Sequence, residues 1–150
     1  MRVIFASDHA GFDLKGKLFA FVKSLGYEVA DLGPYAYNAE DDYPDFIGKA
    51  ARAVSEEPKD TVAVVLGGSG QGEAMTANRF SRVRAAVYYG GNDRLLTLSR
   101  EHNDANVLSL GARFLSEEDA RRAVEVWLHA RFSGAERHVR RIKKIDTETR

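Results

Sequence analysis

The sequence contains no cysteine. This absence excludes disulfide bonds, thiolate metal sites and cysteine nucleophiles. The sequence also lacks any apolar run near the roughly 20 residues that a membrane-spanning helix needs. The opening strand-like segment is followed too soon by Asp8 and His9 to resemble a signal peptide. We therefore expect an uncleaved, cytoplasmic protein that does not enter a membrane.

An excess of charge of one sign is lacking as well, because 22 Lys and Arg balance 22 Asp and Glu. The balance is uneven along the chain, since residues 131–150 hold seven basic and three acidic side chains. A domain that binds duplex nucleic acid is usually basic as a whole, so no nucleic-acid partner is expected. The basic C-terminal segment fits either a site for a small anion or a solvated helix face.

The length of 150 residues, with 44% hydrophobic residues, is that of one globular domain over residues 1–150. Short apolar segments alternate with amphipathic stretches, the pattern of an α/β protein whose parallel strands are joined by crossover helices. Five strands are expected, at residues 2–7, 28–32, 61–66, 84–87 and 106–110. The third is apolar almost throughout, which predicts a central strand covered on both faces.

Helical spacing of apolar residues predicts a first helix between the first two strands, with Gly26 as its C-terminal stop. Further helices are expected at residues 45–56, from about residue 72, at about 92–101 and from Ser116, which resembles a helix cap. The helix that follows Ser116 should bury Trp127 in the core. The irregular stretch Gly33–Pro44 is either a plain surface loop or the lid or wall of a site.

A final helix, roughly Glu136 to Ile145, is polar nearly all round, which a helix packed only on its own domain should not be. We expect it to reach a partner subunit. Arg137 and Arg141 are four residues apart, so they share a face and could clamp a phosphate together. A solvated or interfacial basic face is the alternative, and it is the expectation for the neighbouring Arg140, Lys143 and Lys144.

A glycine-rich segment follows the third expected strand. In an open parallel sheet, ligands bind beyond the carboxyl ends of the strands, where the strand order reverses, and in a flavodoxin-like order the first and third strands flank that point. Four glycines fall within the six residues Gly67 to Gly72. Backbone N–H groups of such a loop can approach an anion closely. The spacing matches neither a nucleotide P-loop nor a dinucleotide fingerprint, and glycines alone also fit a plain turn.

Glu73 follows this loop in the first turn of the expected helix, where a carboxylate is favoured by the helix dipole whatever its role. A carboxylate that faces an oxyanion-binding loop can also move a proton next to a carbonyl. Position alone leaves both readings open.

His102 and Asn103 precede the fifth expected strand, at the end of the sheet opposite the glycine loop. A lone histidine there is usually structural. A catalytic His102 would have to serve the site of a neighbouring subunit. His129 and His138 have no carboxylate cluster, and no metal-ligand spacing occurs elsewhere.

Five motifs together resemble type B ribose-5-phosphate isomerases over nearly the whole chain: Asp8-His9-Ala10-Gly11, Gly68-Ser69-Gly70-Gln71-Gly72-Glu73, His102-Asn103, Leu110-Gly111-Ala112-Arg113 and Arg137-His138-Val139-Arg140-Arg141. Each motif alone is weak, but five in this order and spacing are specific. The resemblance implies a single-domain, Rossmann-like α/β/α sandwich that forms a homodimer or a dimer of dimers with shared active sites. It implies interconversion of D-ribose 5-phosphate and D-ribulose 5-phosphate through an enediolate, within the pentose phosphate pathway, without a cofactor or metal.

The resemblance also implies roles for individual residues. One branch of the family carries a cysteine base at the position of Gly67; this sequence departs from it and resembles the branch in which Glu73 takes the proton. His102 would then help to open the furanose ring. The implied substrate contacts are Asp8 and Asn103 at sugar oxygens, Gly68, Ser69, Gly70, Gln71 and Gly72 around the enediolate, and His9, Arg113, Arg137 and Arg141 at the phosphate.

Two other functions remain open. One is an isomerase of a six-carbon sugar phosphate such as allose or galactose 6-phosphate, because related folds and motifs serve those substrates. The other is a phosphate- or nucleotide-binding module without catalysis. The missing nucleotide fingerprints count against the second.

Overall fold

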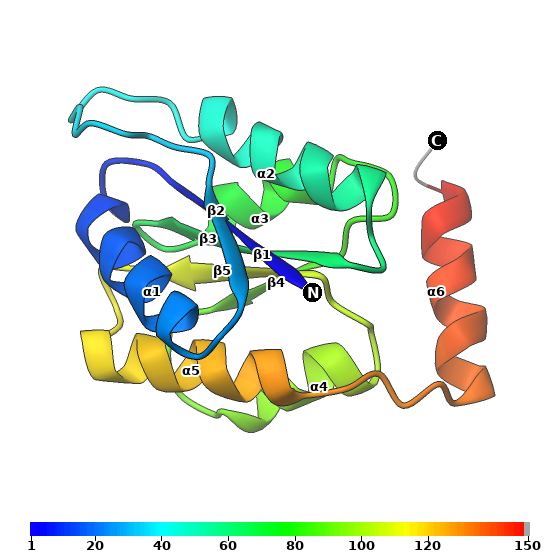
Figure 1. The fold of residues 1–150 in the computed structure, drawn as a ribbon. Coiled ribbons are helices and arrows are strands. Elements are labelled where there is room, and N and C mark those ends of the chain that lie inside the picture. Colours follow the sequence, from blue (N-terminus) through cyan, green and yellow to red (C-terminus); the bar gives the residue numbers. More distant parts are fainter. Residues whose placement is uncertain (149–150) are drawn as a thin grey trace.

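A computed structural model of the chain describes residues 1–148 and shows a five-stranded, all-parallel sheet between two layers of helices (Figure 1). The strands are β1 (Arg2–Ser7), β2 (Glu28–Asp31), β3 (Thr61–Gly67), β4 (Ala85–Tyr88) and β5 (Val107–Gly111). The helices are α1 (Phe12–Ser24), α2 (Pro44–Glu56), α3 (Gln71–Ala77), α4 (Arg94–Glu101), α5 (Glu117–His129) and α6 (Glu136–Glu148). The predicted α/β sandwich with alternating strands and helices is confirmed. None of the helices in the described part is long and apolar enough to cross a membrane.

The strand order is β2-β1-β3-β5-β4. The predicted flavodoxin-like order holds for β2, β1 and β3 but is wrong for the last two strands, because β5 pairs with β3 and β4 lies at the edge. Burial explains the exchange: every residue of β5 is buried, whereas three of the four residues of β4 are only partly buried. The more apolar strand takes the position that helices cover on both faces.

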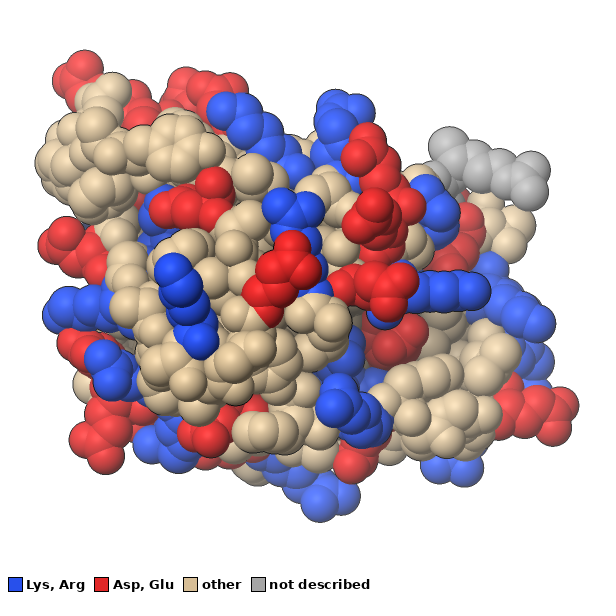
Figure 2. Space-filling model, in the orientation of Figure 1, with Lys and Arg blue, Asp and Glu red and all other residues tan. Residues whose placement is uncertain are grey.

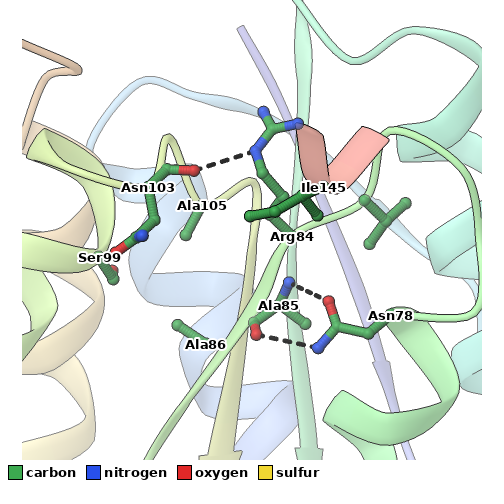
Figure 3. A pocket seen from close by; sticks show the side chains of 9 residues that line it. Asn78, Arg84, Ala85, Ala86, Ser99, Asn103, Ala105 and Ile145 are labelled. Atoms are coloured by element: carbon green, nitrogen blue, oxygen red, sulfur yellow. Dashed lines mark hydrogen bonds between the residues drawn. The ribbon is translucent and has the colours of Figure 1, made fainter. Parts of the chain in front are cut away.

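The exposed edge of β4 is closed by a side chain. The amide of Asn78 accepts a hydrogen bond from the backbone N–H of Ala85 (2.8 Å) and donates one to its carbonyl (3.2 Å) (Figure 3). These bonds occupy the N–H and C=O groups of Ala85, which a sixth strand would otherwise use. The sheet therefore ends at β4.

The two faces of the sheet bury separate cores. On one face, α1, α4 and α5 pack on alternate strand residues such as Val3, Phe5 and Val64. On the other face, α2 and α3 pack on Ile4 and Val65. All of β3 is buried, which confirms the prediction that it is central.

Several local predictions are confirmed by contacts. Trp127 is fully buried, as expected of a core residue. Ser116 caps α5 by accepting a hydrogen bond from the backbone N–H of Asp119 (3.0 Å). Gly26 follows the end of α1 with φ of 89°, a conformation that favours glycine.

Lys15 and Asp31 form a pair that the sequence did not indicate. Lys15 Nζ donates to both carboxylate oxygens of Asp31 (2.7 and 2.8 Å) and to the carbonyl of Pro34 (2.8 Å). Its side chain is almost completely buried. The pair fixes the start of the loop at residues 32–43, which we call the β2–α2 loop.

The β2–α2 loop and α6 lie at opposite ends of the sheet. Figure 1 shows the loop, in cyan, at the end where the strands finish, and α6, in red, at the end where they begin. Among the described residues of α6, only His138 is buried. In the space-filling view, acidic and basic side chains are interspersed, and both kinds stand on the outer side of α6 (Figure 2). The polar character predicted for this helix is confirmed.

Candidate active site

A cavity of about 490 Å³ opens beyond the carboxyl ends of β1, β3 and β5. Its lining comprises Asp8, Tyr43, Gly68, Ser69, Gly72, Glu73, Arg113 and Phe114. Six of these eight residues were predicted as site residues. The two exceptions are Tyr43 and Phe114. The location is the one expected for a ligand site in a parallel sheet.

Backbone hydrogen bonds hold the glycine loop against the segment that follows β5. The backbone N–H of Ala112 donates to the carbonyl of Gly67 (2.8 Å), and that of Arg113 donates to the carbonyl of Gly68 (3.1 Å). The hydroxyl of Ser109 donates to the carbonyl of Gly70, and Gly70 immediately precedes α3 with φ of 78°. These bonds fix the loop, so the N–H groups at the start of α3 are held in place for an anion.

Glu73 lies in the first turn of α3 and is only 4% exposed. A Cβ atom added to Gly67 would lie 1.9 Å from its Oε1 and 2.5 Å from its Oε2. The carboxylate therefore occupies the space that any side chain at position 67 would need. A cysteine base at that position and this placement of the glutamate exclude each other.

Burial raises the pKa of the Glu73 carboxyl group, and the negative charge of Asp8 acts in the same direction. A hydrogen bond from the backbone N–H of Glu73 itself opposes the shift. Burial therefore outweighs this backbone hydrogen bond in the direction of the pKa shift. A raised pKa brings a carboxylate closer to the range in which it exchanges protons at neutral pH.

Asp8 is held beside this carboxylate by the backbone. Its own N–H donates to the carbonyl of Leu66, at the end of β3 (3.2 Å), and its Oδ1 accepts from the N–H of Gly11 (3.1 Å). Gly11 has no room for a side chain, because an added Cβ would lie 2.5 Å from Leu66 Cβ. The glycine in the Asp8-His9-Ala10-Gly11 motif thus allows β1 and β3 to bring Asp8 to the cavity.

Arg113 supplies positive charge on the same side. Its guanidinium group lies close to Gly68, with Nη1 3.3 Å from the position of an added Cβ. His9 lies beside the cavity, with its ring turned to Asp41: Nδ1 is 2.7 Å from Asp41 Oδ1. Gln71 is exposed at the start of α3 and does not line the cavity.

Tyr43 is a lining residue that the sequence reasoning did not name. It immediately precedes α2 and closes the β2–α2 loop. Its ring lies against Gly72, where an added Cβ would come within 2.7 Å of it. The only available signal was the prediction that Gly33–Pro44 is a loop or a site wall, and Tyr43 shows that its end forms part of a wall.

The remaining predicted residues form a second cluster, at the opposite end of the sheet. His102 follows α4 and stacks on His138 of α6, with ring centroids 4.3 Å apart and an angle of 14° between the planes. Arg137 and Arg141 flank His138 on α6, and both are exposed. We call His102, Asn103, Arg137, His138 and Arg141 the α6 cluster. Within one chain, the α6 cluster does not reach the cavity beside Glu73.

His138 belongs to this cluster although the sequence gave it no role. It is buried, and its Nε2 has no hydrogen-bond partner within the described residues. Burial lowers the pKa of His138, and the charges of His102, Arg137 and Arg141 add to this effect. Its stacking partner, His102, is far away in the sequence, so the residues that neighbour His138 in the chain do not reveal this contact.

Asn103 lines a separate cavity of about 340 Å³ between β4, α4 and the end of α6 (Figure 3). Its backbone carbonyl accepts a hydrogen bond from Arg84 Nε (3.0 Å). Arg84 also contacts Asp146 of α6, with a separation of 3.6 Å. Arg84 thus links Asn103 to the helix that carries Arg137 and Arg141.

Several known proteins are similar in sequence to this chain. A family model described as Ribose/Galactose Isomerase matches residues 3–145. Ribose-5-phosphate isomerase B of Mycolicibacterium paratuberculosis is 39% identical over 142 residues, covering 95% of this chain and 87% of that protein. The Escherichia coli protein of the same name is 35% identical over 96% of this chain and 93% of its own length.

Solved structures show the same fold. Ribose-5-phosphate isomerase B from Mycoplasma genitalium with bound ribulose 5-phosphate has a TM-score of 0.93 and 36% identity, over 98% of this chain and 95% of that one. The Clostridium thermocellum protein has a TM-score of 0.91 and 41% identity, over 99% and 97% of the two chains. The chain therefore belongs to the ribose/galactose isomerase family.

Proposed function

We propose that the protein is a ribose-5-phosphate isomerase that interconverts D-ribose 5-phosphate and D-ribulose 5-phosphate. The observation that carries this proposal is the buried carboxylate of Glu73, with a raised pKa, facing a glycine loop and Arg113 in one cavity. The relatives named ribose-5-phosphate isomerase B, and the similar structure with bound ribulose 5-phosphate, support the choice of substrate.

The chemistry follows from these groups. Glu73 removes the proton from C2 of the open-chain aldose, and the hydroxyl proton on O2 passes to O1. The protonated carboxyl group, after exchange with solvent, then delivers a proton to C1, so one carboxylate serves as base and then as acid. Backbone N–H groups around Gly70 stabilise the negative oxygen that develops in between. Asp8 holds a sugar hydroxyl. Arg113 and His9 bind the phosphate and thereby fix the reacting carbons in place.

We further propose that the active unit is a homodimer, or a dimer of dimers, with sites shared between subunits. The support is the separation of the predicted residues into two groups at opposite ends of the sheet. The α6 cluster of one chain would complete the cavity of its partner, where His102 assists ring opening, Asn103 holds a sugar oxygen, and Arg137 and Arg141 bind phosphate. A cysteine-free chain of this kind fits the cytoplasm.

An isomerase for a six-carbon sugar phosphate remains the second candidate, since the matching family model is described as Ribose/Galactose Isomerase. The ratio of kcat/KM for ribose 5-phosphate to that for allose or galactose 6-phosphate separates the two. We expect the five-carbon substrate to be preferred.

The direct test uses proton NMR in D2O with EDTA present. Incubation of ribose 5-phosphate with the purified protein should produce ribulose 5-phosphate with solvent deuterium at C1. Glu73→Gln should abolish both the formation of ribulose 5-phosphate and the incorporation of deuterium, while inorganic phosphate still binds. Tight nucleotide binding without isotope exchange would instead identify a binding module and refute the proposal.

A further inference from the structure

Asp41 connects the middle of the β2–α2 loop to the turn after β1. Its Oδ1 accepts two hydrogen bonds from His9, one from the backbone N–H (3.0 Å) and one from ring Nδ1 (2.7 Å). The Asp41 side chain is 5% exposed, whereas Tyr35 and Tyr37 in the same loop are 77% and 62% exposed. The loop thus exposes aromatic rings and buries a carboxylate, the reverse of the usual preference.

The contact determines how the His9 ring presents itself. An ionised carboxylate can only accept hydrogen bonds, so Nδ1 of His9 must carry the hydrogen of this bond. The ring of Tyr37 packs edge-on against His9, with centroids 6.4 Å apart and an interplanar angle of 86°. With Nδ1 and one ring edge engaged, Nε2 is the nitrogen left for a ligand.

Asp41 is also close in sequence to a second part of the site. Tyr43, which lines the cavity and packs on Gly72, is two residues after Asp41. Asp41 Oδ2 is buried and has no hydrogen-bond partner among residues 1–148. A buried carboxylate oxygen without a donor is unfavourable for stability.

We propose that Asp41 is a positioning residue for the phosphate-binding part of the site. It fixes the tautomer and orientation of His9, so that Nε2 is directed to the phosphate of the substrate, and it holds the β2–α2 loop so that Tyr43 lies against Gly72. This inference rests on the proposed isomerase function for the identity of the ligand. The acidic groups that face His9 are Asp41 and Asp8. A ring nitrogen of His9 and one carboxylate oxygen from each aspartate lie within 4.8 Å of one another.

Kinetics with three variants, each measured in EDTA and compared with an assay without EDTA, test the role. Asp41→Ala should raise KM for ribose 5-phosphate at least about tenfold and change kcat less than about threefold, because it removes a bond to a ligand-binding group and leaves Glu73 in place. Asp41→Asn should restore KM to within about threefold of wild type, since the amide oxygen can still accept both bonds. Asp42→Ala, a change at an exposed neighbour, is the matched control and should behave as wild type.

An unchanged KM in Asp41→Ala would overturn the proposal. So would an Asp41→Asn variant as impaired as Asp41→Ala. The same holds for a KM effect that appears only when EDTA is omitted, because that result would assign Asp8, His9 and Asp41 to a bound cation.

Nitrogen-15 NMR of the histidine rings gives a readout that does not depend on turnover. In the wild-type protein, His9 should carry its hydrogen on Nδ1, and inorganic phosphate should shift the Nε2 signal. Asp41→Ala should lose the Nδ1–H preference and show a weaker phosphate response. Identical tautomers in both proteins would refute the positioning role. A changed tautomer in a protein that does not isomerise ribose 5-phosphate would refute only the proposed function.

Discussion

The two ends of the sheet differ in how their functional side chains are held. At the carboxyl end, Glu73 and Asp8 are buried, and Asp8 is fixed by backbone groups of Leu66 and Gly11. At the amino end, Arg137 and Arg141 stand exposed on a helix that buries only His138 among its described residues. The buried carboxylates at the first end suit proton transfer, which requires a fixed position. The exposed arginines at the second end are accessible to another molecule. We infer that proton transfer between the carbons belongs to the first end, and that the second end supplies the ring-opening His102 and further contacts to the phosphate.

The largest expected effect comes from the base itself. Glu73→Gln should lower kcat about 10³-fold, because general-base catalysis of this kind contributes roughly 10²–10⁴-fold. The affinity for inorganic phosphate, measured by calorimetry, should change little. A variant that keeps a tenth of the activity would refute the assignment of chemistry to the carboxyl end.

Mixed dimers test whether the two ends cooperate across subunits. Glu73→Gln and His102→Ala proteins, each nearly inactive alone, should regain about a quarter of wild-type activity after refolding together, because half of the dimers are hybrids with one intact site of two. Glu73→Gln refolded with itself is the control. Verified hybrids without recovered turnover would show that the sites are not shared.

The glycine at the end of β3 tests the placement of the base. In Gly67→Ala, the new Cβ would lie 1.9 Å from Glu73 Oε1, so the carboxylate must move. Displacement of a reacting group by about 1 Å costs on the order of 10²-fold in kcat.

The control for this prediction is Gly16→Ala, within α1, where an added Cβ meets nothing within 4 Å. It should keep full activity and gain roughly 0.5–1 kcal/mol of stability in urea unfolding. Equal activity of the two variants would contradict the observed position of Glu73.

Removal of one arginine at the other end should weaken binding more than chemistry. Arg137→Ala or Arg141→Ala should raise KM for ribose 5-phosphate about tenfold with kcat nearly constant, as expected for a lost charge-assisted contact to phosphate. Arg140→Ala changes an exposed arginine on the same helix and should leave KM unaltered. If all three substitutions act alike, the helix contributes only general positive charge.

The smallest expected effect is a pH-dependent change in stability. Burial raises the pKa of Glu73 in the folded chain above its value in the unfolded chain. Its favourable contribution is complete below the unfolded pKa and is lost as the pH rises through the folded pKa. Glu73→Gln should therefore be more stable than wild type at pH 8 and not at pH 4.

Urea unfolding at both pH values measures this difference, and an equal difference at both would contradict it. In the wild-type enzyme, kcat/KM should fall as the pH drops through the same raised pKa, because the base must be ionised.

The sequence by itself determined the elements and most of the candidate site. Apolar spacing located all five strands and the first helices, since burial requires a period of two or 3.6 residues. The glycine loop and Glu73 could be named because ligand sites in such sheets follow the strand ends. Chain order also placed His102 at the end opposite this loop.

Only the tertiary structure decided which distant residues meet. It placed β5 between β3 and β4, turned His138 onto His102, and brought Tyr43 and Asp41 from the β2–α2 loop to Gly72 and His9. It also buried Glu73, which raises the pKa of its carboxyl group. These outcomes depend on packing between segments far apart in the chain. Local sequence patterns report on neighbouring residues and do not determine which distant segments come into contact.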